Sequence, residues 1–549
     1  MKTLSRTVLT LFVLSFSCLA AIAGEVSFKI TKQYLNFPIS HKENRGRMTF
    51  EVNGKPDLSV VIRLAPDEAE YWVFKDVSAF KGKTIKITYD GNEKGLSKIY
   101  QSDEIEGQAE LYKEKNRPQF HFTTRRGWIN DPNGLIYYEG EYHLFYQHNP
   151  FERDWENMHW GHAVSKDLIH WTELPDALYP DHLGTMFSGS AVIDYGNTAG
   201  YNKGDTPAMI VAYTAAGPDK QVQCIAYSLD KGRTFTKYTN NPVIDSKHIW
   251  NSHDTRDPKI FWYTSGNHWV MVLNERDGHS IYTSPDLKSW KYESHVTGFW
   301  ECPELFELAV DGNPNNKKWV MYGATGTYML GSFDGKTFIP ESGKYFYTKG
   351  SLYAGQTYTN IPNSDGRRIQ IAWGRISHPS MPFNGMMLLP TELTLHTTKE
   401  GIRLFSNPIK ETKQLFTPLK KWASLTSDKA NDHLKEFRNA ETLRIKTTFK
   451  LSHATSAGID LFGQRILDYD MNANTINSVF YSPEDRNSME LTADIYIDKT
   501  SIEVFIDGGI YSYSMGRKAA NNNQDGIRFW GNNIAVKNLE IFSVKSIWN

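Results

Sequence analysis

The segment from Trp128 to Gly134 reads Trp-Ile-Asn-Asp-Pro-Asn-Gly and places one carboxylate in a setting suited to holding a sugar. Pro132 fixes its own φ and restricts Asp131 to extended backbone. The following Asn-Gly pair is turn-forming sequence. A rigid acid beside an indole and an amide can contact both the apolar face and the hydroxyl groups of a sugar. The same residues also describe an ordinary hairpin tip, so this segment alone leaves both interpretations open.

Two further acidic segments follow at intervals along the chain. Asp257 again precedes a proline and follows Arg256, and Glu301 lies between Trp300 and Cys302. Singly, such acids are more often salt-bridged or capping residues. As a spaced set in strand-rich sequence, they favour a pocket to which several strands each contribute one acid.

Hydrolysis of a glycosidic bond would use such a set. It needs one carboxylate that attacks or activates water and one carboxylic acid that protonates the departing oxygen. Burial favours the protonated form, and hydrogen bonds to the carboxylate favour the anion. We therefore expect Glu301, in apolar sequence, to be the acid and Asp131, beside Asn130 and turn amides, to be the anion. Asp257 is expected to hold sugar hydroxyls and to stabilise an oxocarbenium-like transition state, and the chemistry calls for no metal and no cofactor.

The elements that must position these acids are strands. Short alternating apolar runs separated by Gly, Asn, Asp and Pro predict an all-β protein. Residues 24–113 are expected to form a small β-sandwich-like module, whose role is packing against the next domain or, as an alternative, carbohydrate binding. Residues 415–549 end in strands at 489–497 and 502–506 followed by the hairpin signal Asp507-Gly-Gly, which predicts a C-terminal β-sandwich.

Between these regions a loose repeat runs through residues 117–405. Ser-x-Asp followed by a turn and an aromatic residue recurs at intervals of roughly 50 to 60 residues, beginning at Ser165, Ser228, Ser284 and Ser332. A four-stranded unit with its loops fits that period, which predicts a five-bladed β-propeller. Four unrelated β-turns are the alternative, because the repeat shares few residues.

Length and charge exclude several classes of protein. The chain has 549 residues and a formal net charge of −1, which argues against nucleic acid as a partner. Residues 1–23 have the basic start, apolar run and small-residue end of a secretory signal, and no later segment is apolar enough to span a membrane. Export to the periplasm, cell surface or medium follows, and Cys18 leaves a lipid-anchored form open. With two cysteines beyond the leader there is no disulfide framework.

The motifs together resemble glycoside hydrolase family 32, the invertases, inulinases and levanases. The resemblance runs from about Gln119 to the C-terminus and implies a five-bladed propeller followed by a β-sandwich, with a retaining mechanism. It implies that Asp131 is the nucleophile, Glu301 the general acid and then base, and Asp257 the stabiliser of the transition state. The residues implied to bind the terminal fructose of a fructan or of sucrose are Asn130, Gln147, Trp155, Phe187, Ser188, Arg256 and Trp373.

The chain departs from the family pattern at two places near these motifs. Ile129 stands where Met is common, which we expect to be harmless, and Ser351 stands where many members carry Asp, which affects recognition on the leaving-group side. Endo action, a fructosyltransferase, a non-catalytic fructan-binding protein and an inverting arabinan-degrading enzyme are the rival hypotheses. The sequence decides neither β-2,1 against β-2,6 preference nor the oligomeric state.

Overall fold

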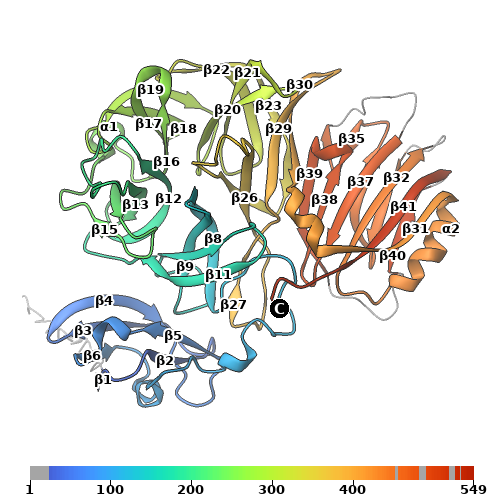
Figure 1. Ribbon diagram of the computed structural model, residues 1–549. Helices are drawn as coiled ribbons and strands as arrows, with labels where there is room; N and C mark the ends of the chain where they lie inside the picture. The colour runs from blue at the N-terminus through green and yellow to red at the C-terminus, as the bar shows by residue number, and fades with distance from the viewer. Residues whose placement is uncertain (1–23, 452–455, 481–489, 519–525, 532, 549) are drawn as a thin grey trace, which may run out of the picture.

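Strands make up nearly all the regular structure of the computed structural model, which describes residues 24–451, 456–480, 490–518, 526–531 and 533–548 (Figure 1). The expected leader, including Cys18, lies outside these residues. No helix within the described ranges is long and apolar enough to cross a membrane. The helices are short: α1 Lys247–Trp250, α2 Ser427–Leu434, and the 3₁₀ turns η1 Ser78–Phe80, η2 Glu93–Lys98, η3 Gln108–Glu110, η4 Thr264–Gly266, η5 Lys410–Leu415, η6 Lys435–Phe437 and η7 Asp507–Gly509.

The N-terminal strands form two small sheets that face each other across a common apolar core. The first sheet has the order β1 Gly24–Lys29, β6 Thr84–Tyr89, β3 Gly46–Val52 and β4 Lys55–Ile62; the second has β5 Tyr71–Asp76, β2 Tyr34–Ile39 and β7 Tyr100–Ser102. β4 is therefore an edge strand, and its free edge faces the rest of the chain.

The central region consists of antiparallel sheets that lie side by side around a common centre, with the first strand of each sheet innermost (Figure 1). Three of them are β8 Gly127–Tyr138, β9 Glu141–Asn149, β10 His159–Ser165 and β11 Trp171–Leu178; β12 Thr185–Asp194, β13 Ala208–Ala216, β14 Gln221–Ser228 and β15 Thr236–Lys237; and β16 Thr255–Tyr263, β17 His268–Glu275, β18 Gly278–Ser284 and β19 Lys291–Thr297. Middle strands such as β13 are buried along nearly their whole length, because neighbouring sheets cover both faces.

A fourth, nine-stranded sheet completes the central region. Its two halves are joined by a single parallel pair between Val310 and Leu395, so each half is an antiparallel unit of its own. The strands are β20 Glu304–Val310, β21 Asn313–Tyr322, β22 Thr327–Phe333 and β23 Phe338–Phe346 in one half, and β25 Leu352–Thr357, β26 Arg368–Gly374, β28 Met386–Met387, β29 Thr391–Thr398 and β30 Gly401–Pro408 in the other; the short strand β27 Phe383–Asn384 adds to β8.

The Ser-x-Asp segments occupy equivalent places in this architecture. Three of them begin at the last residue of the third strand of a sheet, in β10, β14 and β18. In each of these three the serine hydroxyl donates to the aspartate, as in the 3.0 Å bond from Ser165 Oγ to Asp167 Oδ1, and the same carboxylate accepts backbone N–H groups of the turn that follows. The fourth, near the end of β22, uses Asp334 alone. The four segments are thus one recurring turn, and the alternative of unrelated turns is wrong.

The C-terminal strands form a seven-stranded and a five-stranded sheet with the largest apolar core of the described chain between them. The predicted hairpin is β38–β39, joined through η7. The strand order is β24 Thr348–Gly350, β39 Tyr511–Gly516, β38 Ser501–Ile506, β37 Glu490–Ile497, β32 Leu443–Leu451, β41 Ile534–Val544 and β31 Phe416–Thr426 in one sheet, and β36 Val479–Phe480, β35 Thr475–Ile476, β34 Gln464–Asp470, β33 Ser456–Leu461 and β40 Ile527–Trp530 in the other.

A buried histidine joins this C-terminal region to the central sheets. His121 Nδ1 lies 2.8 Å from Asp498 and its Nε2 lies 2.7 Å from Glu503, and Asp498 also accepts the backbone N–H of Gln119. Desolvation lowers the pKa of His121, but the hydrogen bonds and charges of the two carboxylates outweigh it and raise the pKa to about 9. The ring therefore carries a charge at neutral pH and holds the two regions in register.

Candidate active site

Asp131 lies in a β-bulge in the interior of strand β8. Ile129 pairs with His148 on β9, and Pro132 pairs with Tyr146. Two residues of β8, Asn130 and Asp131, therefore lie opposite a single residue of β9. A second irregularity follows between Asn133 and Ile136. The hairpin-tip interpretation of Asp-Pro-Asn-Gly is therefore wrong. The residues bend a strand locally instead of ending it, which is how bulges aim side chains at functional sites.

The same device recurs in the first strands of three other units. The pairing shifts at Ser188 in β12, at Asp257-Pro258 in β16 and at Ala354-Gly355 in β25. Left-handed backbone, which costs about 1–3 kcal/mol for a non-glycine residue, occurs at Asp257 (φ 66°), Glu301 (φ 50°), Cys302 (φ 42°) and Ala354 (φ 52°). Strain of this kind persists only where the surroundings fix the backbone.

The Asp131 carboxylate accepts a 2.7 Å hydrogen bond from Ser188 Oγ, across from β12 to β8. Burial raises the pKa of Asp131, and the Glu301 charge adds to this, while hydrogen bonds from Ser188, Asn130 and Cys302 act in the opposite direction. The amide of Asn130 is itself fixed, because its Oδ1 accepts from Trp128 Nε1 at 2.8 Å. Asp131 is thus a hydrogen-bonded but poorly solvated acid.

Asp257 is 5% exposed and lies on β16, the first strand of the next sheet after the one that begins with β12. Its backbone N–H donates to Thr214 Oγ1 at 3.0 Å, and its Oδ2 accepts from the backbone N–H of Cys302 at 3.0 Å. Burial raises the pKa of Asp257 to about 7; Arg256 opposes the rise, whereas the charges of Asp131 and Glu301 add to it. The acid is held in place mainly by backbone contacts.

Glu301 precedes strand β20 and is bound on both oxygens. Arg256 Nη2 donates to Oε1 at 2.6 Å and Tyr353 Oη donates to Oε2. The backbone N–H of Glu301 donates to Asn274 Oδ1 at 2.8 Å. The expected apolar surroundings are not found. The adjacent Trp300 is 41% exposed, and an arginine and a tyrosine contact the carboxylate instead.

Cys302 joins the acids and was not among the predicted site residues. Its Sγ lies 3.6 Å from Asp131 Oδ2 and 3.6 Å from Asp257 Oδ2, so a single sulfur atom separates the two carboxylates. Burial and the three nearby acids raise the pKa of the thiol well above its usual range. The sequence signal was its place directly after Glu301, and Tyr353 had a comparable signal in the segment Tyr-Ala-Gly-Gln.

Aromatic rings border the acids on two sides. Trp373 on β26 makes edge contacts with Trp128 at 5.8 Å and with Tyr353 at 6.2 Å, and its buried Nε1 has no hydrogen-bond partner in the described structure. On the other side Trp155, 49% exposed, meets the ring of Phe187 edge-on at 5.9 Å. Phe187 directly precedes Ser188, so this ring pair lies next to the Asp131 contact.

Gln147 lies behind the strand segment that carries Asp131, unlike the other predicted residues. It is buried on β9, opposite Trp160 of β10. With the Asn133 amide turned so that its oxygen faces Gln147, the Gln147 Nε2 donates to it at 2.9 Å. No contact joins Gln147 to the three acids directly. It supports the strand segment that carries Asp131.

A buried ion pair closes the space beneath the acids. Lys259 Nζ lies 2.7 Å from Glu304 Oε1, and these side chains are 4% and 1% exposed. Lys259 also donates to the backbone carbonyl of Thr357 at 2.8 Å. The pair borders a small gap under Ser188, Asp257 and Cys302 and thereby seals the centre of the sheets from below.

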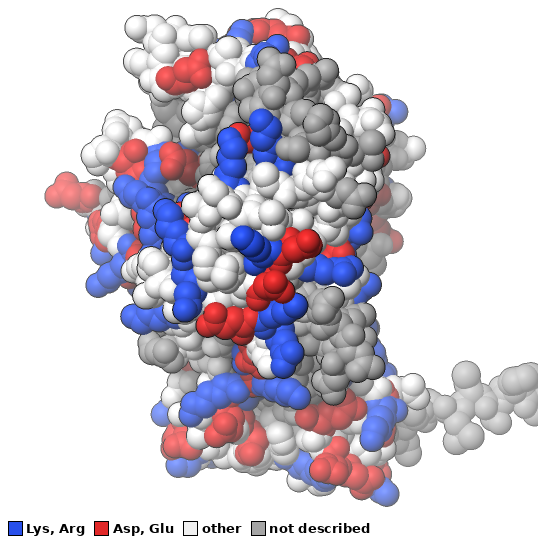
Figure 2. Space-filling model, turned by 90° about the vertical axis from the view of Figure 1, so that its right-hand side faces the viewer, with Lys and Arg blue, Asp and Glu red and all other residues white. Residues whose placement is uncertain are grey.

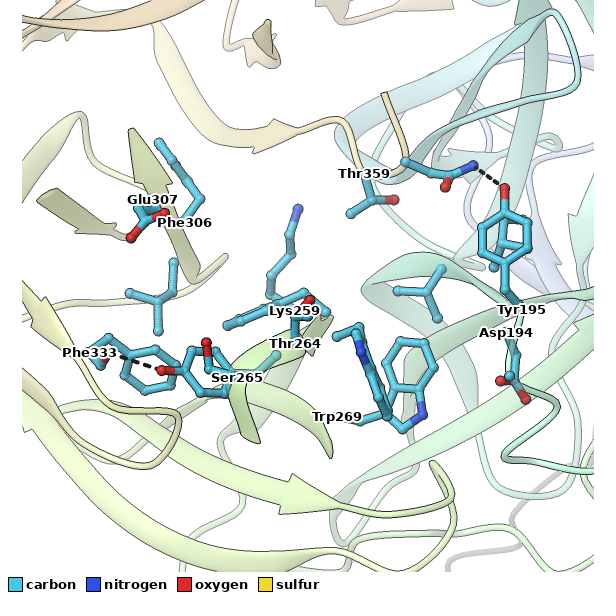
Figure 3. A pocket seen from close by; sticks show the side chains of 18 of the residues that line it. Asp194, Tyr195, Lys259, Thr264, Ser265, Trp269, Phe306, Glu307, Phe333 and Thr359 are labelled. Atoms are coloured by element: carbon cyan, nitrogen blue, oxygen red, sulfur yellow. Dashed lines mark hydrogen bonds between the residues drawn. The ribbon is translucent and has the colours of Figure 1, made fainter. Parts of the chain in front are cut away.

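Beyond this pair, a cavity of about 930 Å³ opens at the opposite ends of β12 and β16 (Figure 3). Its wall includes Asp194 at the end of β12 and Tyr195 directly after it, and Trp262 and Tyr263 at the end of β16. Lys259 also lines the cavity, which extends from it to Tyr263, six positions beyond Asp257 on β16 and therefore about 20 Å from that acid. The cavity therefore does not belong to the acidic site.

The described residues include no candidate metal centre, and the face of the molecule in Figure 2 carries mixed charge. Among the described residues no group of three or more His, Cys, Asp and Glu side chains could hold a metal ion. On the face shown in Figure 2, Lys and Arg lie interspersed with Asp and Glu. That face offers no uniform positive field of the kind that draws nucleic acid.

Known proteins resemble this chain in sequence and in fold. The family model for the N-terminal domain of glycosyl hydrolases family 32 matches residues 121–408. The chain is 38% identical to a levanase of Bacillus subtilis, over 80% of this chain and 72% of that protein, and 32% identical to an extracellular exo-inulinase of Aspergillus niger, over 72% and 88%. Among solved structures, an exo-inulinase of Aspergillus awamori matches 80% of this chain and 100% of its own with a TM-score of 0.69 at 28% identity. A β-fructofuranosidase of Schwanniomyces occidentalis matches 79% and 99% with a TM-score of 0.67 at 26% identity.

Proposed function

The chain belongs to glycoside hydrolase family 32 and is a β-fructofuranosidase, and on this premise we propose that it removes terminal fructose from fructans and sucrose with retention of configuration. The observation that carries the proposal is the convergence of three carboxylates. Asp131 and Asp257 lie on strands of two different sheets, Glu301 lies just before the first strand of a third, and Cys302 contacts Asp131 and Asp257. Two carboxyl groups on one pocket are the minimum for glycoside hydrolysis.

In the proposed mechanism Asp131 attacks the anomeric carbon of the terminal fructose. A carbon–oxygen bond forms to the carboxylate as the glycosidic bond breaks, and Glu301 gives its proton to the departing oxygen. Water then attacks the fructosyl ester while Glu301 takes up a proton, which releases fructose and restores both acids. Asp257 stays hydrogen-bonded to the sugar hydroxyls, and its negative charge offsets the positive charge that develops at the ring.

The proposed fructose subsite uses the side chains that border these acids. The unpartnered Nε1 of Trp373 is free to donate to a hydroxyl group. The ring pair of Trp155 and Phe187 offers an apolar wall. Asn130, Ser188 and Arg256 complete the subsite through contacts that they already make with the acids, and Gln147 acts from beneath through Asn133.

We further propose that the central sheets are the five blades of a β-propeller, followed by a β-sandwich. Support comes from the recurring turn after the third strand and from the single pair that joins the two halves of the nine-stranded sheet. Export to the periplasm, the cell surface or the medium is proposed from the leader-like residues 1–23, and the relative from Aspergillus niger is described as extracellular.

Product analysis over time on sucrose, inulin and levan tests the proposal. Fructose as the only early product supports exo hydrolysis, whereas early oligosaccharides would identify an endo-acting enzyme. Trisaccharide that accumulates faster than free fructose at high sucrose would identify a fructosyltransferase. Arabinose release from arabinan without fructose release would overturn the family-based substrate.

The retaining mechanism has a separate test. Proton NMR during the first turnovers reports the anomer of the released fructose, and the β anomer is expected. An initial α anomer would mean single displacement, for which the two carboxyl groups must lie further apart than about 5–5.5 Å. Asp131→Ala should abolish fructose release, and unchanged release in this variant would remove the catalytic role from the site.

A further inference from the structure

The loop of residues 150–158, between β9 and β10, carries Trp155 to the rim of the proposed fructose subsite. Trp155 contacts Phe187, and the next residue, Ser188, donates to Asp131. The position of this loop therefore bears directly on the pocket wall. Its own supports come largely from the N-terminal module, which the central sheets do not need for their strand pairing.

An aromatic side chain anchors one end of the loop. Phe151 is 1% exposed and belongs to the apolar core of the N-terminal module. Its ring lies 6.1 Å from that of Phe37 and 6.2 Å from that of Phe50. A residue of the central region thus completes the core of the N-terminal module, and the loop cannot shift without opening that core.

Charged groups hold the middle of the loop on both sides of Trp155. The Glu152 side chain is fully buried and accepts from Arg45 Nη2 at 2.9 Å and from Arg63 Nη1 at 2.8 Å. Arg63 Nη1 also lies 2.9 Å from Asp154, and Arg45 Nη1 lies 3.3 Å from Glu156. Both immediate neighbours of Trp155 are therefore paired with arginines of the N-terminal module.

The far end of the loop is paired with a sheet edge. Asn157 Oδ1 accepts from the backbone N–H of Val61 at 2.8 Å, and its Nδ2 donates to the carbonyl of Val61 at 2.8 Å. This side chain occupies the free edge of β4 as an additional strand would. Asn157 has left-handed backbone (φ 47°), which fixes the direction in which the chain enters β10.

We propose that the N-terminal module is a positioning element of the active site. Through Arg45, Arg63 and the edge of β4 it holds the 150–158 loop so that Trp155 forms one wall of the fructose subsite. The inference rests on the proposed function. It assigns to the module an effect on the binding of the terminal fructose and none on the bond-breaking step, since no group of the module contacts the three acids in the described structure.

The test compares Arg63→Gln with a matched control, Arg47→Gln. Arg47 lies on the same module but is exposed and makes no contact with the loop. For Arg63→Gln we expect the KM for sucrose to rise roughly tenfold, which corresponds to about 1.4 kcal/mol, with kcat within about twofold of the parent. Arg47→Gln should leave both unchanged. Arg63→Lys, which keeps the charge but not the paired donors, should recover part of the KM.

A double-mutant cycle with Trp155→Ala separates positioning from a general loss of stability. If the module acts through Trp155, Arg63→Gln adds little to the KM of the Trp155→Ala variant, because the wall is already absent. Additive effects, or an unchanged KM in folded Arg63→Gln, would overturn the inference. Parent enzyme that releases no fructose from sucrose or fructan would instead overturn the proposed function, so the two failures are distinguishable. Thermal unfolding of each variant checks that the folded protein is being compared.

Discussion

Asp257→Asn should stabilise the protein while it impairs catalysis, and the gain should depend on pH. Asp257 is 5% exposed and lies near two further carboxylates. Burial raises its pKa from the ordinary value of 3.8 to about 7, against the opposing charge of Arg256. The folded chain keeps a proton on this acid in a pH range where the unfolded chain has released it.

The size of the effect follows from the shift. At about 1.4 kcal/mol per pKa unit, the difference between 3.8 and about 7 corresponds to about 4 kcal/mol. Because the folded-state pKa is raised, stability falls as the pH rises from about 4 and the loss is complete above about 7. Asparagine resembles the protonated acid and does not titrate. Asp257→Asn should therefore match the parent near pH 4 and exceed its stability by up to about 4 kcal/mol at pH 8.

Urea unfolding of the parent and of Asp257→Asn, at pH values from 4 to 8, measures this difference. Asp205→Asn is a suitable control, because Asp205 is exposed in the loop between β12 and β13 and should give a flat difference. Fructose release measured in parallel should fall in Asp257→Asn alone. A stability difference between Asp257→Asn and the parent that does not change with pH would refute the assigned cause, the cost of charging this buried acid.

Three further outcomes follow from buried groups. Lys259→Met leaves the buried Glu304 carboxylate with its hydrogen bonds from Thr357 but without its cationic partner, and should cost about 3–5 kcal/mol in urea unfolding; the Lys259→Met/Glu304→Met double variant should recover most of it, and an unaffected single variant would contradict the ion-pair account. Because the pKa of His121 is raised to about 9, its stabilisation is complete below pH 6.5 and is lost as the pH rises through 9. The difference in melting temperature between the parent and His121→Gln should accordingly shrink over that range, and a constant difference would argue against a charged ring. Since the pKa of the Cys302 thiol is raised, folded protein should resist iodoacetamide at pH 8, with labelling seen by mass spectrometry only after denaturation; rapid labelling of folded protein would show that the thiol ionises.

The sequence predicted three acids that the structure brings together, but it did not predict their surroundings. The Asp-Pro pairs and the Glu-Cys-Pro segment single out Asp131, Asp257 and Glu301, because each places an acid at or near a proline in strand-rich sequence. The groups that contact Glu301 are Arg256 and Tyr353, which lie 45 and 52 residues away along the chain. Its immediate neighbour Trp300 is 41% exposed, and the Arg256 guanidinium lies over its ring. A side chain's environment is set across strands, so adjacent residues gave the wrong polarity.

Strand pairing decides between the two interpretations of the segment at Asp131. Asn-Gly after Asp-Pro is common at hairpin tips, and the sequence gives no local sign that β8 continues to Tyr138. Whether such a segment ends a strand or bulges within it depends on the partner strand. Here the partner is β9, and its pairing with β8 resumes at Ile136 after the second bulge. By contrast, the Ser-x-Asp turns were predictable, because each is fixed by its own aspartate, which in three of the four also accepts a hydrogen bond from its serine.

The bulges and the charge at Asp257 have a common physical meaning. In a regular strand, successive side chains point to opposite faces of the sheet. The bulges in β8, β12 and β16 shift that alternation where Asp131, Ser188 and Asp257 lie. Bringing the acids together costs backbone strain and desolvation, and the surrounding sheets supply the stability that offsets it. A gain in stability in Asp257→Asn would therefore measure how much of the fold's stability is committed to keeping three acids on one pocket.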